Sequence, residues 1–481
     1  MIQQLEIIGT IYDLLALCSS YILSELKNES YEFELFNEDM YENVYNALNR
    51  YVCEEHERGE RAAFDELKDF MYDYLNAGIT IERCYAVVYY IDDLVKSRVH
   101  RGLTERHDII KYNALNKQYD NKIKIIPKLR DTFVLQGDMH YRKETGSEFS
   151  LFRNRGVCAC SRLDEYMVNY IIWDEDKIED YPMNIYHLEE EHPIAKHFFD
   201  RDKLVFKIVP LTDMPLDKIL DAKCRQKAFY IDKIYPDAEM ILKKRYIDSV
   251  VKSENEDVDF LIYPEMLLTE SMYKELSIQR SKKRPQVIVN GSVWKNKTNK
   301  SVVTDGNGKK IFEYLKKEPY IHTFEGKEYR ELLDHEKNKE YSVLEIARLG
   351  RIGVAICKDL KNEYIKLFHK CIGTDILIVP ACTNSMDLKS SAEEMAGEYN
   401  CAVLVANTCS ARSSNGTDKR IGFISLPAKQ KTDRTTLTIE YSQNECADHC
   451  KQACSSKLLV LKFKQTEQKD GKLSFSIKEV N

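Results

Sequence analysis

Four ionisable side chains in the second half of this chain are spaced so that they could act on one substrate. Three of them stand where an apolar stretch ends: Glu265 closes "DFLIYPE", Lys316 follows "KKIFEYL", and Cys357 closes "RIGVAIC". The fourth, Glu325, lies in "YIHTFEG", nine residues after Lys316. Because active sites of sheet-based α/β proteins gather beyond the carboxyl ends of strands, we expect these side chains to meet there.

These residue types suit acyl transfer from a carbon–nitrogen bond through a thioester. A thiol with its ordinary pKa of about 8.5 is mostly protonated at neutral pH, so a nucleophilic Cys357 needs a base or a nearby cation. Glu265 could accept the thiol proton, and Lys316 could stabilise the thiolate and then the oxyanion of a tetrahedral adduct. The backbone N–H of Lys358 could be a second oxyanion donor. Glu325 could fix the lysine and pass protons to a leaving amine.

The region from about residue 203 onward alternates short apolar segments with helical ones, which predicts an α/β domain. Strands are expected at 203–210, 259–265, 286–292, 351–357, 375–381, 402–407, 421–427 and 458–463, and helices at 215–230, 238–253, 266–280, 360–372 and 389–400. Residues 286–316 contain two turns, "NKTNK" and "DGNG", between three short strands, so an antiparallel meander is expected before Lys316. The sheets should therefore be mixed, and continuous apolar strands such as "DILIV" should be buried on both faces.

Residues 1–200 have a different texture and are predicted to form a mostly helical domain. In "FDELKDFMYDYL" (64–75) the apolar residues fall on one helical face, and "CYAVVYYIDDLVKSRV" (84–99) is a second candidate helix. The acidic stretch 173–193 is expected to be a partly extended connector. The chain is thus divided into a helical domain at 1–200, which could gate a site, bind a protein partner or hold an oligomer, and a catalytic domain at 203–481.

Composition narrows the class of protein. The 481 residues include 78 acidic and 71 basic residues, a net charge of -7, which argues against a nucleic-acid surface over the whole chain. The N-terminus lacks the basic region of a secretory signal, and no charge-free apolar run approaches the length of a membrane span. The 14 cysteines are scattered, so reduced thiols and a cytoplasmic location without membrane contact are expected.

The segments "LIYPEMLL", "YLKKEP" and "GVAICKDL", in this order, resemble the three motifs of the nitrilase, or carbon–nitrogen hydrolase, superfamily. "GTDILIVPA" and "CAVLVANT" are similar to later strands of that family, so the resemblance covers about residues 203–465. It implies an α/β/β/α sandwich in which Glu265 is the general base and Cys357 the nucleophile. Lys316 would be the oxyanion stabiliser and Glu325 the second glutamate. It also implies an amide-type small-molecule substrate, a homodimer or larger homo-oligomer, and no metal or organic cofactor.

Two features depart from the family pattern. Lys317 directly follows Lys316 and is an alternative catalytic lysine, although Pro319, three residues after Lys316, favours the first. Cys357 is followed by Lys-Asp, where nitrile hydrolases usually have Trp-Glu. This Cys-x-Asp form is more similar to the amidase and carbamoylase branches, so an amide or ureido substrate is expected rather than a nitrile.

Other interpretations compete with this one. Cys357 could be a buried core thiol, and the chain a catalytically inactive nitrilase-fold scaffold whose helical half binds a protein or nucleic-acid partner, as in a prokaryotic defence system. "CADHCKQAC" spaces Cys446, Cys450 and Cys454 along one helical face, which could hold a metal but matches no common zinc pattern. "YIDD" at 90–93 is similar to a reverse-transcriptase motif, yet its surroundings favour a plain helix.

Overall fold

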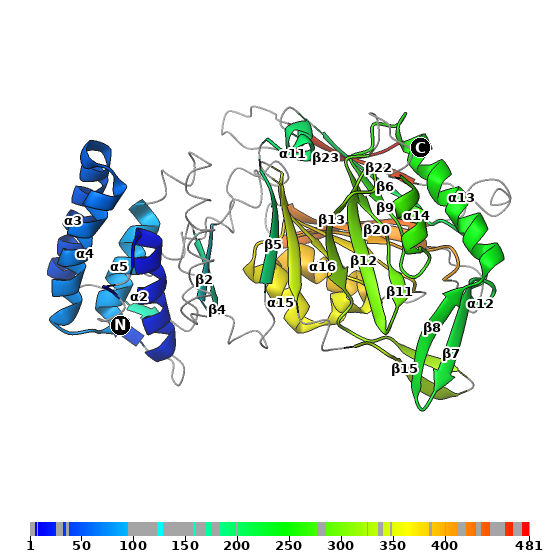
Figure 1. Ribbon diagram of the computed structural model, residues 1–481, viewed down its shortest axis with the longest axis horizontal. Coiled ribbons are helices and arrows are strands. Elements are labelled where there is room, and N and C mark those ends of the chain that lie inside the picture. Colours follow the sequence, from blue (N-terminus) through cyan, green and yellow to red (C-terminus); the bar gives the residue numbers. More distant parts are fainter. Residues whose placement is uncertain are drawn as a thin grey trace. The chain divides into compact units, whose positions relative to one another are not determined.

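Figure 1 shows a computed structural model of the chain, which divides into two compact units. The first unit consists of Met1–Asp131 and His140–Asp180, and the second contains Tyr181–Asn481. The structure describes residues 5–6, 8–25, 32–34, 38–94, 123–127, 157–159, 170–174, 183–189, 191–198, 201, 203–276, 285–324, 326–334, 340–346, 349–383, 387–399, 401–411, 420–429, 434–442, 457–464 and 474–480.

Between Ile11 and Leu94 the first unit is mostly helical. Its described helices are α2 (Ile11–Glu25), α3 (Glu38–Arg58), α4 (Glu60–Asn76) and α5 (Ile81–Leu94). Phe64, Leu67 and Met71 of α4 recur at helical spacing and are buried in the core that these helices share. The "YIDD" motif lies inside α5, where Asp92 is only 4% exposed, so it belongs to a packed helix and not to a strand.

Besides these helices, the described elements of this unit include four short strands, three of them beyond Leu94, which the prediction of a mostly helical domain did not include. β1 (Glu32–Glu34) pairs antiparallel with β3 (Val157–Ala159), and β2 (Ile123–Pro127) pairs antiparallel with β4 (Tyr170–Asp174). β2 and β4 are rich in isoleucine, and β-branched residues favour strands over helices.

The second unit starts earlier than the predicted boundary near residue 200. β5 (Met183–Leu188) pairs parallel with β16 (Tyr341–Ile346), so it is the edge strand of a large sheet. Residues 183–188 were expected to lie in an extended connector. Their extended backbone is therefore right, but its hydrogen bonds belong to the second unit. The short helix α11 (Pro193–Phe198) follows β5.

The first large sheet of this unit is mixed. Its described strands, in spatial order, are β11 (Val293–Lys295), β12 (Thr298–Asp305), β10 (Val287–Val289), β9 (Phe260–Ile262), β6 (Lys203–Ile208), β22 (Lys457–Lys464) and β23 (Ser474–Val480), with β13 (Lys310–Leu315) also on β12. β9 runs parallel to β6 and β10, whereas β11, β12 and β13 form the predicted antiparallel meander. α13 (Pro236–Ser253) and α14 (Glu270–Leu276) share a buried core with it.

The second large sheet has the order β21 (Arg434–Ser442), β20 (Arg420–Lys429), β19 (Ala402–Ala406), β18 (Ile376–Pro380), β17 (Gly350–Val354), β16 and β5. α15 (Glu363–Cys371) and α16 (Asp387–Tyr399) cover it. Gly353 of β17 lies so close to α15 that a Cβ there would be 2.4 Å from the His369 ring. β18 and β19 are buried at every residue, as continuous apolar strands predict.

The two large sheets face each other across a shared core. A Cβ on Gly422 of β20 would lie 3.3 Å from the Ile208 side chain of β6. The rings of Tyr186 on β5 and Phe312 on β13 stack with centroids 5.4 Å apart. Helices lie on the outer side of each sheet (Figure 1). The predicted α/β/β/α sandwich with mixed sheets is therefore confirmed.

One predicted helix is wrong. Residues 215–230 contain only the short α12 (Leu216–Ile219) and then a hairpin of β7 (Leu220–Arg225) and β8 (Ala228–Ile234). Gln226 and Lys227 have φ of 47° and 64°, the left-handed pair that a two-residue hairpin turn requires. β8 also pairs with β15 (Lys327–Glu331), which pairs with β14 (Ile321–Phe324), and this small sheet projects from the body of the unit (Figure 1).

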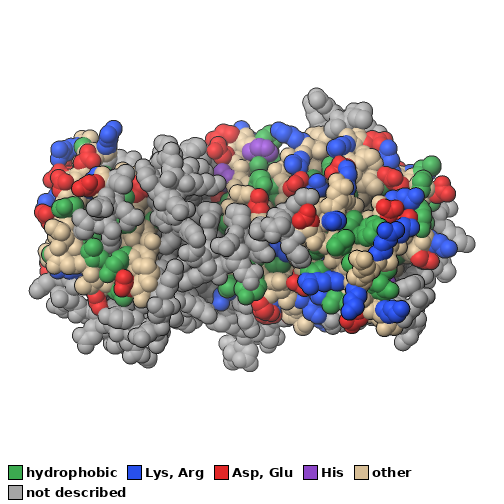
Figure 2. Space-filling view, turned by 60° about the horizontal axis from the view of Figure 1, so that its bottom comes forward, with side chains coloured by type: hydrophobic (Ala, Val, Ile, Leu, Met, Phe, Trp, Pro, Cys, Tyr) green, Lys and Arg blue, Asp and Glu red, His purple; other side chains and the backbone are tan. Residues whose placement is uncertain are grey.

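The described surface is mixed in charge. On the face of the second unit that Figure 2 shows, Lys and Arg side chains are interspersed with Asp and Glu and with apolar groups, in keeping with the small net charge. None of the helices in the described residues is long and apolar enough to cross a membrane.

Candidate active site

Cys357 lies on a tight turn just beyond a buried strand. It opens the 3-10 helix η3 (Cys357–Lys361), three residues after β17 ends, with a φ of 49°. This left-handed conformation costs a non-glycine residue about 1–3 kcal/mol, so the surroundings must hold it. Asp359 does so, because its carboxylate accepts the Ile356 N–H at 3.1 Å and its own N–H donates to Ile356 O at 3.0 Å. The thiol is thereby fixed in a site where Cys357 is only 4% exposed.

Glu265 reaches the same place from the other sheet. It follows β9, and its N–H donates to the carbonyl of Ala381, just past the end of β18, at 3.3 Å. Gly291 permits the close passage of this loop, because a Cβ there would lie 1.9 Å from the carbonyl oxygen of Pro264. The carboxylate is buried, with Glu265 only 1% exposed, so its charge has to be met by partners inside the protein.

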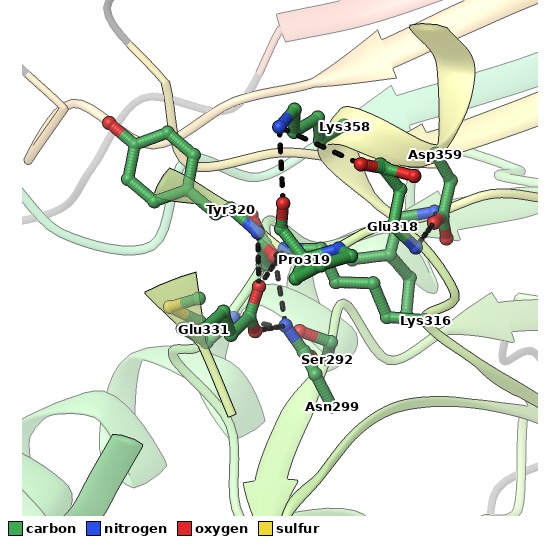
Figure 3. A network of polar contacts seen from close by, with 12 residues as sticks. Ser292, Asn299, Lys316, Glu318, Pro319, Tyr320, Glu331, Lys358 and Asp359 are labelled. Atoms are coloured by element: carbon green, nitrogen blue, oxygen red, sulfur yellow. Dashed lines mark hydrogen bonds and ion pairs between the residues drawn. The ribbon is translucent and has the colours of Figure 1, made fainter. Parts of the chain in front are cut away.

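Lys316 is the centre of a buried ion-pair network, part of which Figure 3 shows. Its ammonium donates to Glu265 Oε1 and to Glu331 Oε2, both at 2.7 Å. Asn299 bridges the same two carboxylates, since its Nδ2 donates to Glu265 Oε1 at 2.9 Å and to Glu331 Oε1 at 3.1 Å. The backbone N–H of Tyr320 also donates to Glu331 Oε2, at 3.0 Å. The Asn299 amide thus donates to both carboxylates and holds them on either side of the Lys316 ammonium.

The electrostatics of the trio Glu265, Lys316 and Cys357 keep the thiol protonated beside a carboxylate of raised pKa. Burial raises the pKa of Glu265, and the neighbouring charge of Glu331 raises it further, while Lys316 and a hydrogen bond with the Cys357 thiol lower it. Burial also raises the pKa of Cys357, as does the charge of Glu265. Burial alone would lower the pKa of Lys316, but the two carboxylates raise it well above its usual value, so it stays charged. A protonated thiol beside a carboxylate of raised pKa is the arrangement of a nucleophile and its general base.

Asp359 connects the cysteine turn to the lysine loop. Besides the Ile356 N–H, its carboxylate accepts the backbone N–H groups of Lys317 at 3.0 Å and Glu318 at 2.6 Å. Burial raises the pKa of Asp359 to about 6, although these donors lower it. The aspartate of the Cys-x-Asp motif therefore has a positioning task that does not depend on the substrate.

Two other predicted site residues, Lys317 and Lys358, make contacts different from those of Lys316. Lys317, the alternative lysine, turns away: its Nζ donates to the Glu340 carbonyl at 2.6 Å and lies 4.7 Å from the Tyr341 ring centre. Burial lowers the pKa of Lys317 to about 8. Lys358 follows the nucleophile, as an oxyanion N–H requires, and its side chain donates to Pro319 O at 3.2 Å (Figure 3).

Glu325 lies outside the described residues, and the carboxylate beside Lys316 that sequence reasoning missed is Glu331. β14 and β15 form a hairpin in which Ile321 pairs with Arg330, and the Glu331 N–H donates to Tyr320 O at 2.7 Å. This hairpin returns the chain to Lys316. The available signal was the period-two pattern of "KEYRE", in which Glu331 is buried at the end of an exposed strand.

Two further side chains lie within electrostatic reach of the trio. Cys382, in the loop after β18, is partly exposed, and its backbone N–H lies near enough to the Cys357 sulfur to lower the pKa of that thiol. Tyr320 is 39% exposed, and burial together with the charges of Cys357, Cys382 and Glu265 raises the pKa of its hydroxyl. A substrate approaching the buried thiol would meet these partly exposed groups.

A metal site has no structural counterpart in the described part of the chain. The described residues include no group of three or more His, Cys, Asp or Glu side chains that could hold a metal ion. Cys446, Cys450 and Cys454, the candidate metal ligands of the sequence, lie outside the described residues.

Comparisons with known proteins find similarity in three-dimensional structure alone. No protein-family model matches the chain, and no curated protein matches it in sequence. Among solved structures, Saccharomyces cerevisiae Nit3, a member of branch 10 of the nitrilase superfamily, is similar over 50% of this chain and 90% of its own, with 13% identity and a TM-score of 0.31. An amidase from Nesterenkonia sp. is similar over 50% and 92%, with 13% identity and a TM-score of 0.32.

A third similar structure is the glutamine-dependent NAD+ synthetase of Acinetobacter baumannii, over 58% of this chain and 48% of its own, with 12% identity and a TM-score of 0.33. Scores and identities this low say nothing of reaction or substrate.

Proposed function

We infer that this chain, whose second unit has a nitrilase-like fold, is a thiol hydrolase of non-peptide carbon–nitrogen bonds. The observation that carries this proposal is the position of the Glu265 carboxylate inside a buried site. It accepts a hydrogen bond from Lys316 Nζ at 2.7 Å, and it lies near enough to the Cys357 thiol for each group to shift the pKa of the other. A core cysteine needs neither a base nor a cation, and burying two carboxylates and an ammonium is costly unless they have a task.

The proposed reaction has two halves. In the first, Glu265 takes the proton of Cys357, and the thiolate attacks the substrate carbonyl carbon. Lys316 and the backbone N–H of Lys358 stabilise the resulting oxyanion. The adduct collapses, Glu265 returns the proton to the leaving amine, and an acyl thioester remains. In the second half, Glu265 deprotonates a water molecule that attacks the thioester and releases the acid and the thiol.

The substrate class is an amide or ureido compound rather than a nitrile. The Cys-x-Asp motif supports this choice by its resemblance to the amidase and carbamoylase branches. Asp359 holds two loops together. The Cys-x-Asp motif is therefore related to the substrate only indirectly, through the geometry of those loops. The reaction could also end in transfer to another acceptor in place of water, since the same residues would serve.

The test uses fluoroacetamide, whose acetamide moiety adds covalently to the active-site cysteine in structures of two glutamate mutants of the Nesterenkonia sp. amidase. The full chain is incubated with this reagent, and the adduct is located by intact mass and peptide mapping. We expect one adduct, on Cys357, that is absent from Cys357→Ser and strongly slowed in Glu265→Gln. Cys224→Ser, which removes an exposed thiol on β7, is the matched control and should react like the wild type.

Turnover is then measured on a panel of small amides and ureido compounds by amine or ammonia release. Hydrolysis that Cys357→Ser abolishes supports the proposal. A wild-type chain that neither forms the adduct nor hydrolyses any compound of the panel would overturn it in favour of an inactive scaffold.

A further inference from the structure

A second thiol stands beside the nucleophile, and the proposed hydrolysis does not use it. Cys357 follows β17 and Cys382 follows β18, and these two strands are parallel neighbours in register from Ile352 and Ile376 onward. Each cysteine comes a few residues after its strand ends, so both loops leave the sheet at the same edge. Topology alone therefore brings the two residues side by side.

The loop that carries Cys382 is also held next to the site. The Ala381 carbonyl, directly before Cys382, accepts the Glu265 N–H at 3.3 Å, and the backbone N–H of Cys382 lies near enough to the Cys357 sulfur to lower the pKa of that thiol. The amide nitrogen and the Cβ of a residue are only two bonds apart. An amide near the Cys357 sulfur thus places the Cys382 side chain close to that sulfur as well. A disulfide requires this proximity, with Cβ atoms about 3.5–4.5 Å apart.

We propose that Cys357 and Cys382 form a peroxide-sensitive thiol pair that closes into a reversible disulfide and switches the site off. The oxidant is hydrogen peroxide or a small organic hydroperoxide. Glu265 takes the Cys357 proton, and the thiolate attacks a peroxide oxygen. A sulfur–oxygen bond forms, the oxygen–oxygen bond breaks, and the leaving hydroxide or alkoxide takes up that proton as water or alcohol. Cys357 is then a sulfenic acid.

In the second step the Cys382 sulfur attacks the sulfenic sulfur. The sulfur–sulfur bond forms, the sulfur–oxygen bond breaks, and the hydroxide leaves as water with the proton of the Cys382 thiol. The two thiols have together lost two electrons and two protons, and the peroxide has gained them. A dithiol reductant reverses the closure by thiol–disulfide exchange.

The surroundings of the pair suit this chemistry. Cys357 has the base and the cation that a reactive thiolate needs, while its 4% exposure admits only a small oxidant. Burial raises the pKa of the Cys382 thiol, but the residue is partly exposed, so a reductant can approach Cys382 more readily than the buried Cys357. The inference shares one step with the proposed function, the deprotonation of Cys357 by Glu265, but it requires no substrate and no hydrolysis.

The experiment treats the reduced full chain with hydrogen peroxide, in the presence and absence of dimedone, and maps cysteine peptides by mass spectrometry. We expect a wild-type product lighter by two hydrogen atoms, with the Cys357 and Cys382 peptides joined, and recovery of fluoroacetamide labelling after dithiothreitol. Cys382→Ser should instead accumulate the dimedone adduct and then the sulfinic acid on Cys357, and reductant should not restore its labelling. Cys224→Ser should behave like the wild type.

Three outcomes are distinguishable. Joined peptides in a chain without amide turnover would support the thiol pair and reject the hydrolase. Turnover in a chain where Cys357 proceeds to sulfinic acid equally fast with and without Cys382 would reject the pair and keep the hydrolase. Joined peptides that pair Cys357 with a different cysteine in the wild type would also overturn the inference.

Discussion

Replacing Glu331 by Gln changes one charge at the centre of the network and tests how the trio is tuned. Glu331 Oε2 accepts two donors, Lys316 Nζ at 2.7 Å and the Tyr320 N–H at 3.0 Å, and Oε1 accepts Asn299 Nδ2 at 3.1 Å. A glutamine has only one acceptor oxygen. If that oxygen keeps the two donors, its amide nitrogen faces Asn299 Nδ2, and two donors oppose each other.

Asn299 cannot relieve this conflict by turning its amide over. Its Nδ2 also donates to Glu265 Oε1 at 2.9 Å, and a flipped amide would place an oxygen against that carboxylate. A buried polar group left without its hydrogen bond costs about 1–3 kcal/mol. We therefore expect Glu331→Gln to lower the free energy of unfolding by about 1–3 kcal/mol.

The same substitution changes the pH dependence of the nucleophile. Burial and the charge of Glu331 both raise the pKa of Glu265, so removing that charge lowers it. Glu265 then stays ionised, and able to accept the thiol proton, down to a lower pH. We expect the acidic limb of the Cys357 labelling rate to move to lower pH in Glu331→Gln.

Unfolding in urea, followed by circular dichroism, and the rate of fluoroacetamide labelling across pH measure the two effects. Glu328→Gln is the matched control, because Glu328 lies on the same strand β15 and is exposed, and should change stability by less than about 0.5 kcal/mol. The reasoning is refuted if Glu331→Gln unfolds like Glu328→Gln and keeps the wild-type acidic limb.

Three further substitutions test the positioning of the site. Lys316→Met leaves two buried carboxylates without their cation, so it should lower the free energy of unfolding by about 3–5 kcal/mol and abolish labelling of Cys357. Lys317→Met should still be labelled, and equal labelling of the two variants would contradict the assignment of Lys316. Asp359→Asn places an amide group against backbone N–H donors, so it should lower the free energy of unfolding by about 1–3 kcal/mol, measured by calorimetry, and slow the labelling of Cys357. A variant that is labelled at the wild-type rate would refute the link between the two loops. Gly291→Ala drives a Cβ to 1.9 Å from the loop before the general base and should slow labelling far more than Gly326→Ala, whose Cβ meets nothing within 4 Å; similar rates in both would show that only backbone strain matters.

The strands of the sandwich could be predicted from the sequence because they are continuous apolar runs, several of which end at an ionisable residue. The antiparallel meander before Lys316 could also be predicted, since turn residues separate its strands. The hairpin at 220–234 was not, because its turn residues are Gln226 and Lys227, which seldom adopt left-handed conformations and gave no turn signal.

The residues of the candidate site could be predicted from the sequence only in part, for a related reason. Glu265, Lys316 and Cys357 each follow a strand in the first or second large sheet, and strand ends can be found from apolar periodicity. Glu331 comes from the small sheet, where its strand is short, mostly exposed and rich in charge, so the period-two pattern was too weak a local signal to favour it over Glu325. Its position depends on pairing between β8 and β15, which are about a hundred residues apart, and such a contact is not encoded in a local pattern.

Glu265 and Cys357, the proposed general base and nucleophile, follow strands on opposite sheets of the sandwich, 92 residues apart in sequence (357 minus 265). No single folded segment therefore contains a working site. Reactivity of Cys357 can arise only after both sheets have formed and closed on each other, and this long-range docking is the slow kind of folding event. In a refolding time course, recovery of secondary structure should come first and recovery of Cys357 labelling should come after it. The rate at which Cys357 labelling recovers during refolding therefore measures the docking of the two sheets.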